Sequence, residues 1–200
     1  MLEVSGLHAG YAKTQVLRGV NLNASKGKIT CLLGRNGFGK TTTLKAIMGL
    51  IDRTGSVKVN GEELIDAPPH LICRAGVALV PQDRRIFPTL TVKENLAMGI
   101  KPGQVSTNPL WTSDALMEAF PNLRTRERSF GRNLSGGEQQ MLSVARALIS
   151  DPEVVLLDEP TEGLSPIMVE SLESVILQTA ERNAAILLVE SKLSVALRLA

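Results

Sequence analysis

The sequence predicts an α/β fold with a mostly parallel core sheet, and three observations support this prediction. Short runs rich in Val and Leu, at 29–33, 77–80, 154–157 and 185–189, alternate with segments of helical periodicity. Each run is apolar at nearly every position, which is typical of parallel strands buried on both faces. The stretch 91–150 has mostly helical patterns, so we expect a helical lobe inserted into the domain.

The N-terminal part of the chain predicts a small antiparallel β subdomain. Strand patterns occur at residues 2–7, 15–17 and 20–22, separated by turns. Residues 55–61 alternate in polarity and end in Asn-Gly, which is typical of an exposed antiparallel strand. The expected helices lie at 40–50, 68–74, 92–98, 112–119, 135–149, 166–182 and 192–200. The polar residues 101–108 predict a surface loop between two of these helices.

Length, composition and charge exclude several classes of protein. A chain of 200 residues has the usual size of one domain with a sub-lobe. A net charge of +2 and an aromatic content of 3% give no broad basic surface and few rings for stacking on bases, so no nucleic acid is expected as a partner. The apolar runs are about six residues long, whereas a membrane span needs about 20. The N-terminus shows no signal-peptide pattern.

Cysteine and histidine contribute no motif. Cys31 and Cys73 lack the paired spacing of a metal site. Because Cys31 lies in an apolar run, we expect a reduced core cysteine in a cytosolic protein. His8 and His70 lie outside every motif and are expected at the surface.

A glycine-rich loop follows the apolar run 29–33 and precedes a helical pattern. It fits G-x-x-x-x-G-K-[ST] in the strand–loop–helix context that this motif requires. Its glycines allow backbone N–H groups to surround a phosphate, and the helix N-terminus adds a favourable dipole. Lys40 is expected to contact the β- and γ-phosphates, and the Thr41 hydroxyl to ligate Mg²⁺. The candidate nucleotide-binding residues here are Gly34, Arg35, Asn36, Gly37, Phe38, Gly39, Lys40, Thr41 and Thr42.

Two carboxylates follow the apolar run 154–157. Asp158 is expected to hold Mg²⁺ through water, and Glu159 to polarise an attacking water as general base. Acidic residues often follow strands, so this signal is weak when it stands alone. Its position downstream of a phosphate-binding loop makes it specific.

A third motif, Leu134–Gln140, begins a predicted helix. Ser135 is expected to be the N-cap, and Glu138 has the spacing of a capping box, so a well-capped helix is the simplest interpretation. Two adjacent glycines are unfavourable at a helix start unless a group must approach the backbone closely. A phosphate would explain them. The candidate nucleotide-binding residues of this motif are Ser135, Gly136, Gly137 and Glu138.

These motifs, in this order, resemble those of the nucleotide-binding subunits of ATP-binding cassette (ABC) transporters, and the resemblance covers nearly the whole chain. It implies the P-loop NTPase fold of an ABC cassette, with ATP and Mg²⁺ as ligands. It also implies that two cassettes pair head to tail, so that each ATP lies between the phosphate loop of one and Ser135 of the other. It finally implies that 1–200 is a single nucleotide-binding domain with a helical lobe at about 83–150 and a C-terminal end that is cut short.

The resemblance assigns roles to further positions. Tyr11 is similar to the aromatic residue that stacks on adenine, although a lone tyrosine is otherwise an ordinary surface or core residue. Gln82 is similar to the glutamine that contacts Mg²⁺ and the attacking water and begins the lobe facing the membrane subunit; without the resemblance it would be a polar turn residue. The segment 162–166 corresponds to the loop that crosses to the partner cassette.

Two segments, 81–96 and 135–142, resemble importers of branched-chain amino acids and their relatives for urea and short amides. The implied partners are transmembrane permease subunits, a second ATPase subunit that is identical or paralogous, and, indirectly, a periplasmic or extracellular solute-binding protein. The implied location is peripheral, at the cytoplasmic face of the membrane. The solute itself is recognised by other subunits.

Three residues depart from the family pattern. Ser191 stands where most cassettes have a histidine that contacts the γ-phosphate and where these importers commonly have glutamine, so we expect slower hydrolysis without loss of ATP binding. Ser165 replaces an aspartate in the crossing loop, and Phe38 is bulky for its position in the phosphate loop. Two other functions stay open: a non-transport ABC protein, and a regulatory cassette in which ATP switches dimerisation with little turnover. A different phosphate-loop enzyme, such as a kinase, would not need the 134–138 motif.

Overall fold

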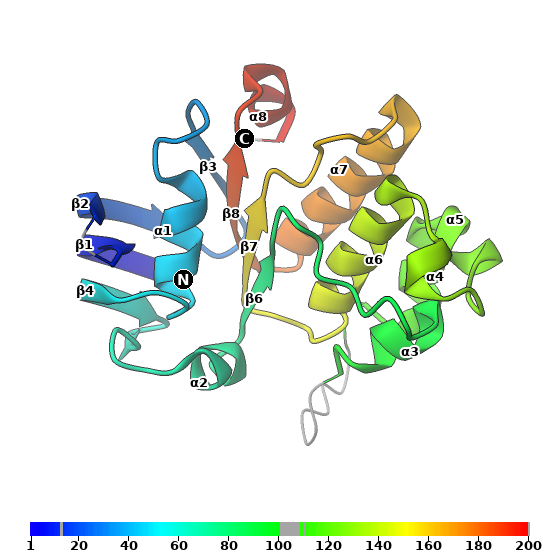
Figure 1. Ribbon diagram of the computed structural model, residues 1–200, viewed down its shortest axis with the longest axis horizontal. Helices are drawn as coiled ribbons and strands as arrows, with labels where there is room; N and C mark the ends of the chain where they lie inside the picture. Colours follow the sequence, from blue (N-terminus) through cyan, green and yellow to red (C-terminus); the bar gives the residue numbers. More distant parts are fainter. Residues whose placement is uncertain (13, 101–108, 110, 200) are drawn as a thin grey trace.

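The computed structural model describes residues 1–12, 14–100, 109 and 111–199. Within them the chain forms an antiparallel sheet, a parallel sheet and a helical lobe (Figure 1). The expected surface loop at 101–108 lies outside the described residues. None of the described helices has both the length and the apolar composition needed to cross a bilayer.

The antiparallel sheet confirms the expected N-terminal β subdomain. The patterns expected as separate strands at 15–17 and 20–22 belong to one long strand, because the chain continues to pair with its neighbour across Gly19 despite an irregular register. Across the sheet the strands are β2 (Thr14–Ala24), β1 (Leu2–Tyr11), β4 (Arg53–Val59) and β5 (Glu62–Glu63).

The second sheet is parallel throughout, as the sequence predicts. Its strands, in spatial order, are β3 (Ile29–Leu33), β8 (Ala185–Glu190), β7 (Val154–Asp158) and β6 (Val77–Val80). Every residue of β7 and β8 is buried. The expectation of burial on both faces is wrong for the edge strand β3, whose residues are all partly buried or exposed, whereas β6 at the opposite edge is mostly buried.

Helices lie on both sides of the parallel sheet. Figure 1 shows α1 between this sheet and the antiparallel one, whereas α6 and α7 lie on its other side. The short helix α5 and a 3₁₀ turn at Gly131–Asn133 were not expected. The helices are α1 (Lys40–Ile47), α2 (Pro69–Arg74), α3 (Val92–Ala97), α4 (Ser113–Ala119), α5 (Pro121–Thr125), α6 (Gly136–Leu148), α7 (Pro166–Glu181) and α8 (Leu193–Leu199).

Helix α1 ends earlier than the periodicity predicts. The guanidinium of Arg53, on β4, donates to the carbonyls of Ala46 and Ile47 at the end of this helix. Gly49 then turns the chain with a φ of 68°. A distant arginine therefore satisfies the terminal carbonyls and fixes where the helix stops.

Two hydrophobic cores share the parallel sheet as a common wall. Alternate residues of β7 enter different cores, since Val155 and Leu157 face the helical lobe while Val154 and Leu156 face α1 and the antiparallel sheet. This alternation follows from the two-residue period of a strand. The carboxyl ends of the parallel strands therefore lie where the two cores meet.

Residues outside the motifs behave largely as expected. His8 and His70 are exposed. The expectation of a core cysteine is only partly correct, because Cys31 is half-buried on the edge strand β3. Burial nevertheless raises the pKa of its thiol, which favours the protonated form.

Candidate active site

The candidate site lies at the carboxyl ends of the parallel strands. Strand β8 lies between β3, which leads into the glycine-rich loop, and β7, which ends at Asp158. In open α/β sheets this edge is where ligands bind. The topology therefore brings together the first two motifs, which are far apart in the sequence.

The glycine-rich loop leaves the start of α1 open to a ligand. Gly37 and Gly39 have φ angles of 88° and 85°, which side chains rarely allow. Gly39 directly precedes α1, and no side chain caps this helix. The first amides of α1, at Lys40, Thr41 and Thr42, therefore face the loop as an anion site.

Lys40 is buried and bonded from two directions. Its Nζ donates to the carbonyls of Gly34 and Arg35 (2.7 and 3.2 Å) and to Oδ1 of Asn36 (3.3 Å), all in the loop. It also forms an ion pair with Oε1 of Glu159 at 3.1 Å, and both side chains are only 7% exposed. A buried ammonium must be paired, so this contact fixes the loop against the end of β7.

Glu159 itself has an unusual backbone. Its φ is 46°, in the left-handed region that non-glycine residues rarely occupy. Its backbone N–H donates to the carbonyl of Val189 on β8 at 2.9 Å. Such strained residues persist where the surrounding structure holds them, and they occur often at functional sites.

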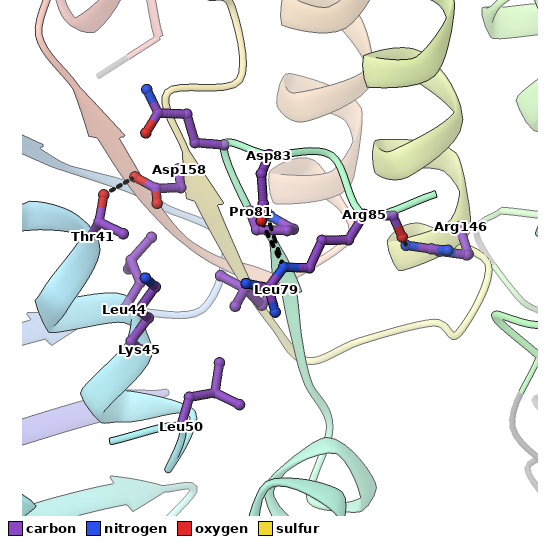
Figure 2. Close-up of a pocket in the computed structure, with 11 residues that line it drawn as sticks. Thr41, Leu44, Lys45, Leu50, Leu79, Pro81, Asp83, Arg85, Arg146 and Asp158 are labelled. Atoms are coloured by element: carbon purple, nitrogen blue, oxygen red, sulfur yellow. Dashed lines mark hydrogen bonds and ion pairs between the residues drawn. The ribbon is translucent and has the colours of Figure 1, made fainter. Parts of the chain in front are cut away.

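Thr41 and Asp158 meet beside this ion pair. The Thr41 hydroxyl donates to Oδ1 of Asp158 at 3.1 Å (Figure 2). Burial raises the pKa of Asp158, and the Thr41 hydrogen bond and Lys40 oppose that rise. Hydroxyl and carboxylate oxygens are the ligands that Mg²⁺ prefers.

These two oxygens fit a magnesium ion that is shared with a nucleotide. No three His, Cys, Asp or Glu side chains among the described residues form a metal-binding group. Mg²⁺ usually takes one or two protein ligands and completes its shell with phosphate oxygens and water. Thr41 and Asp158 supply that small protein share.

A cavity of about 420 Å³ opens beside Thr41 and Asp158. Figure 2 shows their bonded pair at one side of the cavity and the ion pair of Asp83 with Arg85 at the other. Gln82 also lines this space, but in this conformation its Nε2 donates to Oε2 of Glu162 at 2.8 Å. The structure thus brings Gln82 near the predicted metal ligands and ties its amide to the loop after Glu159.

The third motif lies apart from the first two. Helix α6, which begins at Gly136, and α1 are on opposite sides of the parallel sheet (Figure 1). The expected capping box is present: Ser135 Oγ accepts from the Glu138 backbone N–H (3.3 Å), and Glu138 Oε2 accepts from that of Ser135 (2.7 Å). The chain therefore does not bring Ser135 to its own Lys40.

The two glycines of this motif already have close neighbours within the chain. A Cβ on Gly136 would lie 2.9 Å from Nη1 of Arg84, and one on Gly137 would lie 2.7 Å from the sulfur of Met168. Both positions therefore need glycine for packing within the chain as well as for the expected approach of a phosphate. Nothing in the local pattern indicates these contacts, because Arg84 and Met168 come from other segments.

Three further predicted site residues, Tyr11, Phe38 and Ser191, are exposed. Tyr11 ends β1 and is 44% exposed, and Nζ of Lys45 lies 5.9 Å from the centroid of its ring. Phe38 is 78% exposed, so its side chain points away from the loop interior. Ser191 is exposed in the turn after β8.

Sequence reasoning also missed a buried pair beside the site. Oε1 of Glu190 accepts from the hydroxyl of Thr161 at 2.8 Å. Burial raises the pKa of Glu190, and the Thr161 hydrogen bond opposes that rise. The available signal was a glutamate at the end of an otherwise apolar run.

Comparison with known proteins decides the family. Residues 17–162 match the family described as ABC transporter. The chain belongs to the ABC transporter family. It is the ATP-binding subunit of such a transporter, and it is an ATPase. This confirms the resemblance on which the sequence analysis relied.

Three relatives of this ABC subunit cover nearly all of it. The high-affinity branched-chain amino acid transport ATP-binding protein BraG of Pseudomonas aeruginosa is 40% identical over 100% of the chain and 86% of the relative. The probable branched-chain amino acid transport ATP-binding protein LivF of Archaeoglobus fulgidus is 39% identical over 100% and 85%. The lipopolysaccharide export system ATP-binding protein LptB of Haemophilus influenzae is 33% identical over 95% and 80%.

Solved structures confirm the ABC fold. A structure described as the ATP binding subunit of an ABC transporter has a TM-score of 0.88 and 30% identity, over 99% of this chain and 82% of that one. A dimeric bacterial ABC transporter cassette has a TM-score of 0.83 and 23% identity, over 98% and 90%, which bears on the fold alone.

The buried ion pair makes a prediction about stability. Lys40→Met leaves the Glu159 carboxylate buried without a cation, so we expect a loss of about 3 kcal/mol in the free energy of unfolding of the nucleotide-free chain. Adding Glu159→Gln should recover about half of that loss, because the two residues are coupled. Urea denaturation measures both effects.

Lys93→Met is the matched control for this cycle, since the Lys93 side chain is 75% exposed and pairs with Glu127 only at 3.6 Å. We expect it to change the free energy of unfolding by less than about 0.5 kcal/mol. Equal losses in Lys40→Met with and without Glu159→Gln would contradict the pairing.

Proposed function

We propose that this ATPase energises an importer of branched-chain amino acids, with urea and short amides as the nearest alternative solutes. The two relatives that are about 40% identical over the whole chain are named for branched-chain amino acid transport. The segments 81–96 and 135–142 have the pattern of the same group. The lipopolysaccharide export relative is less similar, at 33% identity.

The site residues have distinct proposed roles. The observation that carries them is that Lys40, Thr41, Asp158 and Glu159 meet at one end of the sheet. Lys40 and the loop amides bind the phosphates of ATP and stabilise charge on the γ-phosphoryl group. Thr41 and Asp158 would hold Mg²⁺, which would neutralise phosphate charge when bound. Glu159 accepts a proton from the attacking water.

ATP binding redistributes the contacts of Lys40. In the described conformation this ammonium bonds to the loop and to Glu159. A phosphate competes for the same cation with more negative charge, so Lys40 turns to the nucleotide and Glu159 becomes available for water. Gln82, whose amide bonds to Glu162 here, would contact the metal and the attacking water when both are bound.

A second cassette completes the site. Because Ser135 and α6 lie across the sheet from α1, the Leu134–Gln140 motif of this chain does not reach the ATP bound by the same chain. Head-to-tail pairing brings Ser135, Gly136 and Gly137 of one subunit to the γ-phosphate held by the other, at a helix N-terminus. The exposed Tyr11 stacks on adenine.

The proposed assembly contains two ATPase subunits, identical or paralogous, and transmembrane permease subunits. A solute-binding protein outside the membrane delivers the solute to the permease and acts on this subunit only indirectly. The subunit is peripheral, at the cytoplasmic face of the membrane. The chain 1–200 acts in it as one nucleotide-binding domain, and its helical lobe, about 83–150, transmits closure of the dimer to the permease.

Reconstitution with its cognate permease and solute-binding protein tests this function. We expect leucine, isoleucine or valine to stimulate ATP hydrolysis and to accumulate in proteoliposomes, while urea and short amides do so less. Stimulation by urea alone identifies the amide branch, and no stimulation by either class of solute contradicts the proposal.

The complex carrying Glu159→Gln should bind ATP, remain dimeric and hydrolyse ATP at least about 100-fold more slowly, since a general base contributes about that much.

Ser191 gives a second prediction. Its side chain is exposed in the turn after β8 and is shorter than histidine or glutamine, so it reaches a phosphate only through water. We expect Ser191→Gln or Ser191→His to raise kcat for ATP severalfold with little change in ATP affinity. An unchanged kcat in both variants means that this position does not limit hydrolysis.

A further inference from the structure

Glu190 is a buried carboxylate to which the proposed reaction gives no task. It is the last residue of β8 and is 2% exposed, and its hydrogen-bond donor Thr161 is 3% exposed. The Thr161 hydroxyl donates to Oε1 of Glu190 at 2.8 Å. A carboxylate placed so deeply requires a hydrogen-bond donor, and here the donor comes from the segment that follows Glu159.

The main chain around Glu190 connects the same segments. The carbonyl of Glu190 accepts from the backbone N–H of Gly34, the first residue of the phosphate loop, at 3.3 Å. The carbonyl of Val189 accepts from the backbone N–H of Glu159 at 2.9 Å. The end of β8 therefore bonds to the phosphate loop on one side and to the segment after β7 on the other.

The Thr161 hydrogen bond extends this connection beyond the sheet. The chain after β7 passes through Glu159, whose φ of 46° is strained, and reaches Thr161 two residues later. A strained residue keeps its conformation only when both sides are held. Val189 holds one side through the backbone, and Glu190 holds the other through the Thr161 side chain.

We propose that Glu190 and Thr161 are positioning residues for ATP hydrolysis. Their hydrogen bond sets the distance between the segment that carries Glu159 and the turn that carries Ser191. The inference rests on the proposed role of Glu159 as general base. Once Lys40 turns to the nucleotide, these bonds are what keep Glu159 and the Ser191 turn aligned on the γ-phosphate.

The effect should appear in kcat and not in ATP binding. Glu190 and Thr161 belong to the segments that approach the attacking water, whereas the phosphates are bound by the loop and α1. A displacement of about 1 Å at the reacting groups lowers a rate by as much as about 100-fold. Loss of the pair should therefore slow hydrolysis while KM for ATP changes little.

Thr161→Val is the test, because valine has the shape of threonine without its hydroxyl. In steady-state ATP hydrolysis by the full chain with its permease, we expect kcat to fall about tenfold and KM for ATP to change less than about twofold. Thr161→Ser retains the hydroxyl and should restore most of kcat. Wild-type kcat in Thr161→Val, or equal losses in Thr161→Val and Thr161→Ser, would overturn the proposal.

A matched control separates positioning from stability. Thr179 on α7 is also 2% exposed, and its hydroxyl donates to the carbonyl of Val175 at 2.7 Å, away from the nucleotide site. Thr179→Val should lower the melting temperature without lowering kcat at 25 °C. A loss of kcat in Thr179→Val equal to that in Thr161→Val would show a general effect of stability and contradict the positioning role.

Glu190→Met completes a double-mutant cycle. Methionine keeps roughly the length of the side chain but removes both oxygens that could accept from the Thr161 hydroxyl. In Glu190→Met/Thr161→Val we expect kcat no lower than in the worse single variant, because both changes break the same bond. A loss of kcat in the double variant equal to the product of the two single losses would contradict the pair.

Glu159→Gln, assayed in parallel, tests the general base alone. Normal turnover in this variant would refute the role of Glu159, whatever the result for Thr161→Val.

Discussion

The buried ammonium of Lys40 is the constraint on which the site depends. At 7% exposure it needs acceptors on every side, and it finds them in the phosphate loop and in Glu159. Those two segments are distant in sequence, and they meet only because β3 and β7 lie on either side of β8. In the proposed mechanism, the charge that holds the nucleotide-free site together also attracts phosphate, so nucleotide binding breaks the ion pair of Lys40 with Glu159 and release restores it.

The parallel sheet separates the phosphate loop from the start of α6. Alternate residues of β7 and β8 enter the core of the helical lobe and the core behind α1, which makes the sheet a rigid partition. The phosphate loop lies with α1 on one side, and the capped start of α6 lies on the other. An ATPase built in this way cannot close on its own nucleotide, so its two motifs suit a pair of subunits better than a single one.

The motifs could be predicted from sequence because each is local. Spacing fixed the phosphate loop, the carboxylates after β7 and the Ser135 capping box, and the alternation of apolar runs with helices predicted the parallel sheet. What could not be predicted depends on contacts between distant segments. Arg53 ends α1, Arg84 covers Gly136, and Glu190 binds Thr161, and none of these contacts leaves a periodic signal in the sequence.

The affinity for ADP with Mg²⁺ tests the central claim most directly, since the proposed mechanism has ADP bind Lys40 without hydrolysis. If Glu159 competes with phosphate for Lys40, then isothermal titration of the full-length Glu159→Gln variant should show a Kd about threefold to tenfold lower than that of the wild type. Asp83→Asn, which removes a carboxylate from the other side of the same cavity, should leave Kd nearly unchanged. Equal or weaker binding by Glu159→Gln, or an equal gain in Asp83→Asn, would contradict the account.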